Sequence, residues 1–444
     1  MRLFLAEKPS QANDIANVLG VKRRGDGFIE VTGGDKVTFA RGHFYELAEP
    51  QEYQDSWGGY WRWEQLPMLP DKFKMKPVRG AGAQLKVIKD LLKAADTCVI
   101  ATDAGREGEL IAREILEEAK FKGKVLRFWT SSLTPKDIAA KLKTLLDGSE
   151  TYPLFEAATA RRNSDWAHGL NITRAATLAS QHRGDYYPVG RVQTPTLAMV
   201  VRRNEAIKNF KPVTYYELEA VVRTAKGAEF KMLHAPEEEK RITEKSVAEQ
   251  LVNKAQRHQG PIRVENASGK ESPPLPYSMP QLQKDANRAF KFSPKKTLEL
   301  AQKLYEKKAA TYPRTDCQYL AASQKDDVPE ILSRLRALFS GDVSKLQTMG
   351  VTLRDSTFND AKLTDHHGII PTSLNVSLEG EELQLFTLIA QRFLRTLAPD
   401  CLFNQTKLSL DANGVLFKAS GRAVTSPGWT GIKLLSSETE DDAE

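Results

Sequence analysis

The sequence predicts an α/β domain at the N-terminus, followed by mainly α-helical domains and an antiparallel β domain that is split along the chain. Two patterns support this fold class. The first 150 residues alternate short apolar runs with amphipathic helical segments, which is typical of a mostly parallel sheet. Later, two stretches that alternate apolar and polar residues flank a long helical block, and the second contains the turn pair Asn413–Gly414.

The N-terminal α/β region is expected to span residues 1–150. Its helices are recognised by leucine and isoleucine recurring on one face, and its strands by short continuous apolar runs. Residues 30–75 are rich in Trp, Gly and Tyr, interrupt this rhythm, and are expected to form an excursion from the domain. The expected strands and helices are 3–6, 97–103, 124–129, 84–95 and 107–119.

The remaining chain divides by the same kind of pattern. Residues 151–212 contain few helix breakers and are expected to form a helical domain. Alternating stretches at 213–270 and 399–435 are expected to form one split β domain, with a helical domain, 271–398, inserted between them. The final residues, 436–444, are acidic and are expected to be a solvated tail.

Composition narrows the class of protein. The net charge is +7, and residues 270–320 hold ten Lys or Arg against five Asp or Glu, which favours a polyanionic partner. Three cysteines without C-x-x-C spacing argue against a disulfide framework or a zinc site and favour a reducing compartment. No apolar run approaches the roughly 18 residues of a membrane span, and the start turns charged too early for a signal peptide. We expect a cytoplasmic protein without a membrane segment.

Acidic side chains follow two of the predicted strands. Glu7 comes directly after the first strand and Asp103 directly after the second, while Glu107 opens the next helix. If the two strands are neighbours, these carboxylates face a crevice at the sheet edge where ligands bind, and they would suit Mg²⁺. Lys8 could offer a cation to a phosphate. The alternative is that acidic residues at a helix start only complement the helix dipole.

One tyrosine lies in a polar, cationic stretch, "KKAATYPRTDCQYL". Attack by the Tyr312 phenol on phosphorus would need cationic neighbours, because its ordinary pKa is near 10. Arg314 lies two residues on and can present a fork to a phosphate. The alternative is a structural tyrosine in a turn. Further on, "TDHHGIIPT" contains His366 and His367, which lack the partners of a zinc site, although one of them could contact a phosphate.

Taken together, the motifs resemble those of type IA DNA topoisomerases, in particular their topoisomerase III branch. The segments "FLAEKPSQA", "ATDAGREGELIAREI", "DWAHGLNITRA", "GRVQTPTL", "TYPRTD" and "HHGIIPT" occur in the order seen in that family. The resemblance covers residues 3 to about 430. It implies a toroidal arrangement of an N-terminal TOPRIM domain with a parallel sheet, helical domains and a split β domain.

The resemblance implies roles for individual residues. Tyr312 matches the nucleophile that bonds to the 5′ phosphate of a cut strand. Arg314 and His366 match residues that stabilise this phosphate. Glu7 matches the candidate for proton transfer to the departing 3′ oxygen, and Lys8 the residue that positions the phosphate.

Further roles concern metal and DNA. The Mg²⁺ ligands implied by the resemblance are Glu7, Asp103 and Glu107. The positions that match the lining of the single-strand groove are Arg161, Asp165, Arg191 and Gln193.

The implied function is isomerisation of DNA. The enzyme would cut one strand, pass another and religate without ATP, and would thereby relax or decatenate DNA. The sequence contains no G-x-x-x-x-G-K-[ST] loop, the motif that binds nucleotide phosphates. Single-stranded or underwound DNA is the expected partner, and RNA stays open as a second substrate. The protein is expected to act as a monomer in the cytoplasm, on nucleoid or plasmid DNA. Two alternatives stay open: a shortened relative that only binds single-stranded DNA, and a TOPRIM nuclease or primase that uses only the acidic crevice.

Two departures from the family pattern stand out. The second aspartate of the metal motif is replaced by Gly105, so we expect a weaker or differently coordinated Mg²⁺ site. Relatives also continue past this sequence into helices that complete the DNA-binding domain, including a Gly-Thr-x-Ala-Thr-Arg-like segment, and often into zinc-binding tails. We therefore expect a fragment or a short member, in which binding and cleavage are better supported than relaxation.

Overall fold

The computed structural model describes residues 1–130, 133, 135–180, 184–235, 241–364, 366–373 and 375–435. The expected acidic tail lies outside these residues. The chain clusters into two units, Met1–Lys208 with Thr364–His367, and Asn209–Leu363 with Gly368–Glu444. No helix among the described residues is long and apolar enough to cross a membrane.

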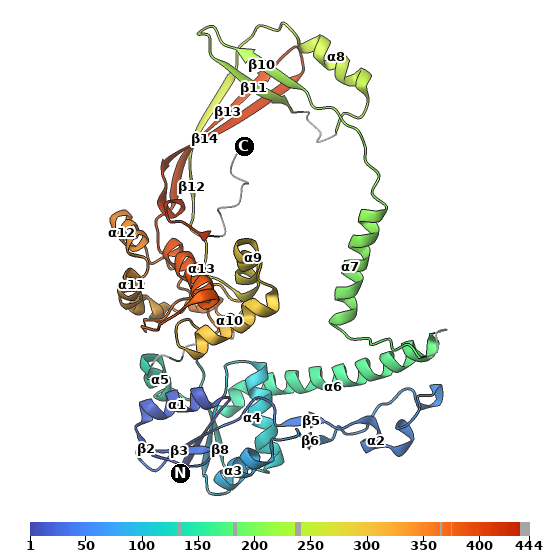
Figure 1. Cartoon of the computed structure of the whole chain (residues 1–444), viewed down its shortest axis with the longest axis vertical. Helices are drawn as coiled ribbons and strands as arrows, with labels where there is room; N and C mark the ends of the chain where they lie inside the picture. The colour runs from blue at the N-terminus through green and yellow to red at the C-terminus, as the bar shows by residue number, and fades with distance from the viewer. Residues whose placement is uncertain are drawn as a thin grey trace. The chain divides into compact units, whose positions relative to one another are not determined.

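The first unit is built on a seven-stranded sheet in the order β2-β3-β4-β1-β7-β8-β9. Figure 1 labels β2, β3 and β8 of this sheet. The four central strands, β4, β1, β7 and β8, run parallel. Strand β3 pairs antiparallel with β4, β2 with β3, and β9 with β8. The sheet is thus parallel where the sequence predicted it. The strands are β1 (Arg2–Ala6), β2 (Val21–Arg24), β3 (Phe28–Val31), β4 (Lys36–Phe39), β7 (Thr97–Ala101), β8 (Lys124–Arg127) and β9 (Leu146–Asp147).

Helices cover both faces of this sheet because its central strands are apolar on both sides. Leu3 and Leu5 of β1 pack with α3 and α4, whereas Phe4 and Ala6 pack with α1 and α5. Strand side chains alternate in direction, so one apolar strand feeds two cores. A long helix, α6, packs on α4 through Leu110. The helices are α1 (Pro9–Leu19), α3 (Gly82–Lys93), α4 (Arg106–Glu118), α5 (Pro135–Leu142), α6 (Gly148–Ala179) and α7 (Gln193–Lys208).

The excursion expected near 30–75 begins later than predicted. Strand β4 belongs to the main sheet, where it pairs in parallel with β1 from Leu3↔Lys36 to Ala6↔Phe39. The part that leaves the sheet is held by the two-stranded pair β5 (Tyr45–Leu47) and β6 (Met75–Pro77) and contains α2 (Pro50–Tyr53). A four-residue strand is too short to show a period in sequence, so β4 escaped prediction.

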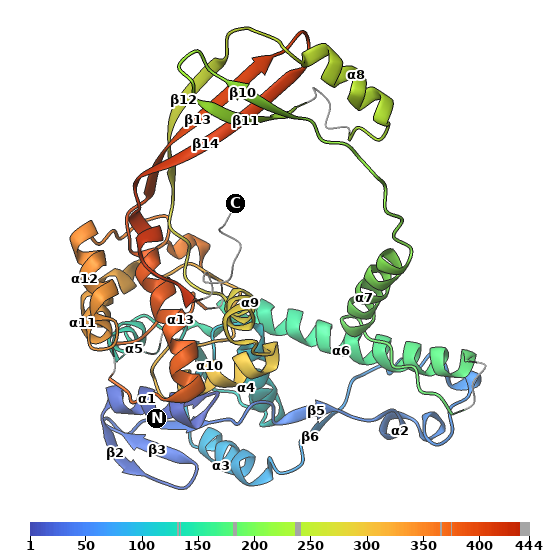
Figure 2. The ribbon, with the colours of Figure 1, turned by 45° about the horizontal axis from the view of Figure 1, so that its top comes forward.

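The second unit combines a helical core with a split sheet. Five antiparallel strands in the order β10-β11-β14-β13-β12 form the sheet, and α8 packs against it (Figure 2). The last two strands return after the helical insertion, as predicted, and their turn places Asn413 at φ 57° and Gly414 at φ 82°. The strands are β10 (Glu219–Arg223), β11 (Glu229–His234), β12 (Arg263–Glu271), β13 (Cys401–Asp411) and β14 (Leu416–Ser426).

The inserted helices pack around one apolar core in which α13 is central. Nine residues of α13 are buried, including Phe386 and Phe393. The helices of the second unit are α8 (Lys245–Ala255), α9 (Met279–Phe290), α10 (Pro294–Glu306), α11 (Val328–Arg336), α12 (Ser340–Met349) and α13 (Gly380–Thr396).

Candidate active site

Three predicted residues meet at one edge of the parallel sheet. Strands β1 and β7 are neighbours, so Glu7, Lys8 and Asp103, which follow them, lie at the same edge. The backbone N–H of Asp103 donates to Glu7 Oε2 at 3.1 Å. Lys8 Nζ lies 3.6 Å from Glu7 Oε1 and 3.4 Å from Asp103 Oδ2. The side chains that follow the two strand ends therefore lie close together in the first unit.

Glu7 is the most perturbed acid of this edge. Glu7 is 7% exposed. Burial is the largest cause that raises the pKa of its carboxyl above the usual range, and the negative charge of Asp103 is the second. Lys8 opposes this shift. A raised carboxyl pKa is one property that general acids in enzymes have.

Gln11 is a further residue of this edge, which the sequence did not single out. Its Nε2 donates to Asp103 Oδ1 at 3.2 Å, and its Oε1 accepts from the Glu7 backbone at 2.9 Å. It lies one turn into α1, three residues after Lys8, and this helical spacing was the only signal that could have found it. Gln11 therefore ties the two acidic residues to each other.

Buried arginine holds the backbone that carries Asp103. Arg127 is fully buried, and its Nε donates to Glu109 Oε1 at 2.5 Å. Its Nη1 donates to the carbonyls of Ile100 and Thr102, and its Nη2 to that of Asp103 at 2.7 Å. Four guanidinium contacts to fixed groups leave the end of β7 little freedom.

Glu107, the third predicted ligand, is engaged elsewhere. Its Oε1 lies 2.9 Å from His43 Nε2, and its side chain is 76% exposed. Hydrogen bonding to Glu107 first, and to Glu114 second, raises the pKa of His43 to about 9. His43 follows β4. Because the sequence did not predict this strand, it did not predict that His43 lies at this edge either.

The acidic pair fits a divalent cation in its chemistry. Glu7 and Asp103 supply hard oxygens, and a bound cation would relieve the repulsion between these two carboxylates. Within the described part of the chain no cluster of three His, Cys, Asp or Glu side chains is arranged to hold a metal. Two protein carboxylates suit Mg²⁺, which keeps several waters.

Tyr312 lies in the second unit, in a loop tied to the segment that follows the two histidines. Thr311 N–H donates to the Ile370 carbonyl at 3.0 Å, and Ile370 N–H donates to Thr311 Oγ1 at 3.0 Å. Tyr312 is half-buried and packs edge-on against Tyr305, with ring centroids 5.2 Å apart. Arg314 is exposed. The motifs "TYPRTD" and "HHGIIPT" are thus hydrogen-bonded neighbours.

The two histidines differ in exposure. His367 is 3% exposed, whereas His366 is half-buried. The catalytic assignment to His366 stays a prediction, as do those to Tyr312, Arg314, Glu7 and Lys8.

Three of the four predicted DNA-groove residues are linked on the first unit. Arg191 makes two hydrogen bonds to Asp165, at 2.7 and 3.2 Å, and Arg161 Nε lies 3.8 Å from the same carboxylate. The hydrogen bond from Arg191 holds the pKa of Asp165 below its usual range. Gln193 opens α7 and is exposed. The DNA contacts of these residues stay predictions.

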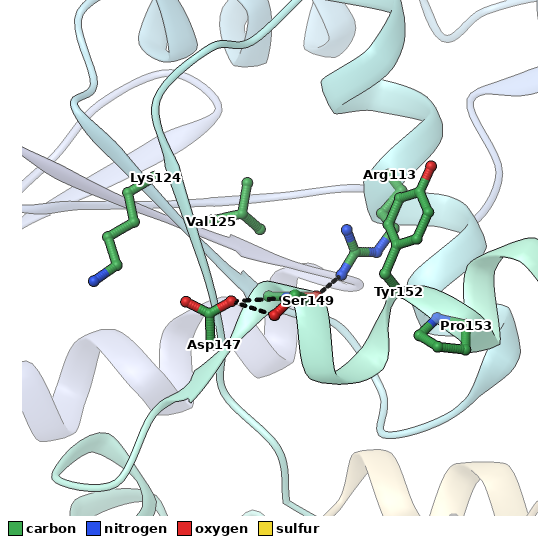
Figure 3. A pocket seen from close by; sticks show the side chains of 8 residues that line it. Arg113, Lys124, Val125, Asp147, Ser149, Tyr152 and Pro153 are labelled. Atoms are coloured by element: carbon green, nitrogen blue, oxygen red, sulfur yellow. Dashed lines mark hydrogen bonds between the residues drawn. The ribbon is translucent and has the colours of Figure 1, made fainter.

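A separate depression of about 420 Å³ lies at the other edge of the sheet (Figure 3). It is lined by Lys124 at the start of β8 and by the first residues of α6. Because β8 runs parallel to β7, its start lies opposite the strand ends that carry the acidic pair. Asp147 accepts hydrogen bonds from the Ser149 backbone and hydroxyl. The depression is therefore not part of the candidate active site.

Comparisons with known proteins show the family to which the chain belongs. A family model described as DNA topoisomerase matches residues 149–444, and a Toprim domain model matches residues 2–133. The chain is 39% identical to DNA topoisomerase 3 of Bacillus licheniformis, over all of this chain and 61% of that protein. It is 34% identical to DNA topoisomerase 3 of Vibrio cholerae, over all of this chain and 71% of that protein.

The chain belongs to the type IA DNA topoisomerases. A solved structure of topoisomerase I from Thermotoga maritima shares the type IA fold with it, with a TM-score of 0.63 at 21% identity, covering 97% of this chain and 67% of that one. The chain spans 61% of the length of the topoisomerase 3 proteins of Bacillus licheniformis and Bacillus subtilis. Family membership and the topoisomerase III likeness expected from the motifs are thus confirmed.

Proposed function

We propose that this chain cuts one DNA strand through Tyr312, holds the 5′ phosphate as a phosphotyrosine, lets another strand pass and rejoins the break without ATP, relaxing or decatenating DNA. The observation that carries the proposal is the setting of Tyr312. Its side chain is half-buried in a polar loop, not enclosed in an apolar core, and the loop is hydrogen-bonded to the segment after the two histidines.

The chemistry is an exchange of one phosphodiester for another. Tyr312 Oη attacks phosphorus and releases its phenolic proton to water, a tyrosyl O–P bond forms, and the bond to the 3′ oxygen breaks. The 3′ oxygen leaves with a proton, for which Glu7 is the proposed donor. Lys8, Arg314 and His366 stabilise charge on the phosphoryl oxygens. Religation reverses each step, so no external energy is required.

Mg²⁺ is the proposed metal of the acidic edge. Glu7 and Asp103 would hold it, and Glu107 is the further ligand that the family resemblance implies. When bound, the ion supplies positive charge to phosphate oxygens near the cut. The Gly105→Asp variant should bind Mg²⁺ more tightly, measured by calorimetry on the DNA-free protein, and should need less Mg²⁺ for cleavage. An unchanged affinity and requirement would count against the proposed site.

The substrate is proposed to be single-stranded or underwound DNA, lying along Arg161, Asp165, Arg191 and Gln193. We place the protein in the cytoplasm, on nucleoid or plasmid DNA, where it acts as a monomer. RNA oligonucleotides in the assay below test whether RNA is also a substrate.

Position of the label distinguishes the proposed chemistry from other cleavage. A single-stranded oligonucleotide labelled at its 3′ end should give a denaturation-resistant adduct with the protein, because the phosphotyrosine carries the downstream fragment. The same oligonucleotide labelled at its 5′ end should give only a shortened free product. Tyr312→Phe should abolish both while retaining DNA binding.

The matched control is Tyr319→Phe, a neighbouring phenol whose oxygen lies 3.5 Å from Lys362 Nζ. This variant should keep the adduct. Cleavage that survives Tyr312→Phe would favour a TOPRIM nuclease instead. Binding without any adduct in the unaltered protein would favour a DNA-binding relative.

A further inference from the structure

A second pocket lies at the same sheet edge as the candidate active site, beside β4. Its volume is about 350 Å³, and it is lined by the loop after β4, the loop before β3, the segment between β6 and α3, and the start of α3. These segments share an edge because β4 is parallel to β1, and β3 begins where its antiparallel partner β4 ends, at Phe28↔Thr38. The carboxyl edge of a parallel sheet is where such folds bind ligands.

Two arginines of this pocket have no hydrogen-bond or ion-pair partner among the described residues. Arg41 and Arg79 are exposed, and neither makes a hydrogen bond or ion pair with any residue that the structure describes. Asp26 is the one carboxylate among the lining residues, so the two arginines leave the pocket cationic. An unpaired guanidinium presents a planar fork that matches the oxygens of a phosphate.

The start of α3 adds to the same character. Its N-cap is Ala81, which makes no side-chain hydrogen bond, and the first turn contains no acidic residue. The first N–H groups of the helix are thus not capped by a side chain, and the positive end of its dipole is not neutralised. This feature supports the arginines but would not by itself define a site.

The pocket lies one strand away from the predicted proton donor. Ala40 N–H donates to the Ala6 carbonyl at 2.8 Å, directly before Glu7 on one strand and Arg41 on the other. Neighbouring strands are about 4.8 Å apart. A strand whose scissile phosphate lies at Glu7 and Lys8 would therefore bring an adjacent phosphate within reach of the long Arg41 side chain after β4, and Arg79, between β6 and α3, lines the same pocket.

We propose that Arg41 and Arg79 bind a backbone phosphate that is adjacent to the scissile phosphate on the same DNA strand. This inference rests on the proposed function. It assigns a task to the loop after β4, which the sequence analysis had placed in an excursion. The pocket would recognise the phosphodiester itself and not a base, so it positions the strand without selecting sequence.

The first test measures oligonucleotide affinity as a function of salt in a Tyr312→Phe background, which prevents cleavage. Arg41→Gln and Arg79→Gln should each weaken binding roughly fivefold, as expected for losing one charged hydrogen-bond contact. The double variant should lower the slope of log affinity against log salt by about 0.7, the value for one phosphate of a single strand.

The matched control is Lys93→Gln, at the far end of the same helix, where Lys93 pairs with Asp90 at 2.8 Å. This substitution removes the same unit of charge at the other sheet edge and should leave both affinity and slope unchanged. If Lys93→Gln changed affinity and slope as much as the arginine substitutions do, the effect would come from the overall charge of the protein, and the proposal would be overturned.

The second test locates the phosphate. Single methylphosphonate linkages, which are neutral, are placed in turn along the oligonucleotide. A methylphosphonate at one position next to the cut should weaken binding to the protein that keeps both arginines. The same linkage should have no further effect on binding to the double variant. If every position weakens both proteins equally, the pocket does not bind the strand.

Failure of this inference is distinct from failure of the proposed function. The 3′-label adduct assay, made with Tyr312 intact, reports cleavage, whereas the salt slope and the methylphosphonate scan report this pocket. Adduct formation with unchanged slopes in the arginine variants would overturn only the pocket.

Discussion

Arg127 is the side chain on which the acidic edge most depends for its shape. It is fully buried, is paired with Glu109 and holds three carbonyls at the end of β7. Arg127→Met should destabilise the protein by about 3–5 kcal/mol, because Glu109 would keep a buried charge with one partner fewer. Denaturant unfolding measures this loss.

The control for Arg127 is a surface arginine of the same sheet. Arg23 pairs with Glu30 at 2.8 Å but is exposed. Arg23→Met should leave the unfolding midpoint within experimental error, since exposed pairs are solvated and screened. Similar losses in the two variants would show that burial of Arg127 does not matter.

Cysteine chemistry is also decided residue by residue. Cys98, Cys317 and Cys401 are free and buried, and burial raises the pKa of the Cys98 thiol to about 12. The thiolate is the reactive form, so Cys98 should resist alkylation in the native protein even at pH 9. Mass spectrometry after iodoacetamide, with and without denaturant, checks this, and rapid native labelling would contradict the burial.

At the scale of elements, the start of α4 depends on the absence of a side chain. A Cβ at Gly108 would lie 2.1 Å from the carbonyl oxygen of Asp103. Gly to Ala inside a helix normally stabilises by up to about 1 kcal/mol. Here Gly108→Ala should instead lower stability and cleavage, because the Asp103 backbone would have to move.

Gly341 provides the contrasting case. It lies near the start of α12, and a Cβ there would meet nothing within 4 Å. Gly341→Ala should be neutral or slightly stabilising in thermal melts. Equal effects of the two substitutions would show that the close approach at Gly108 has no cost.

Two helices of similar length should differ in local stability. Helix α7 has 16 residues and no buried side chain, with Leu197 63% and Met199 69% exposed, whereas α13 has 17 residues and nine buried ones. An isolated helix of this length is marginal in water. Hydrogen exchange should therefore be fast throughout α7 and slow in α13, and equal protection would contradict this packing.

At the scale of the whole molecule, the chain crosses between its two clustered units through an exposed segment. Residues 209–215 have no helix or strand, and Phe210 is 73% exposed. Proteolysis requires locally extended, unpaired backbone. Chymotrypsin should cut after Phe210 well before Phe403, which lies in β13 between two paired strands. Early cleavage at Phe403 would contradict this difference.

The sequence could predict much of this architecture because long elements leave a repeating signal. Helices α3 and α4 carry leucine and isoleucine at helical spacing, and β13 and β14 alternate around an Asn-Gly turn. The same logic brought Glu7 and Asp103 together, since each ends a strong apolar strand. Strand β4 escaped because four residues carry no period, and Arg41 and His43 escaped with it.

What the sequence by itself determined was the family, the order of elements and the residue types that could handle a phosphate, because motif identity and periodicity are properties of the chain alone. What only the tertiary structure decided was which of these side chains share an environment. The pairing of Glu107 with His43, the bridge from Gln11 to both acidic residues, and the lack of a partner for Arg41 and Arg79 among the described residues all depend on strand order and burial. Those quantities arise when strands distant in sequence are packed side by side, where the charge and solvation of each group are set by neighbours that local sequence does not specify.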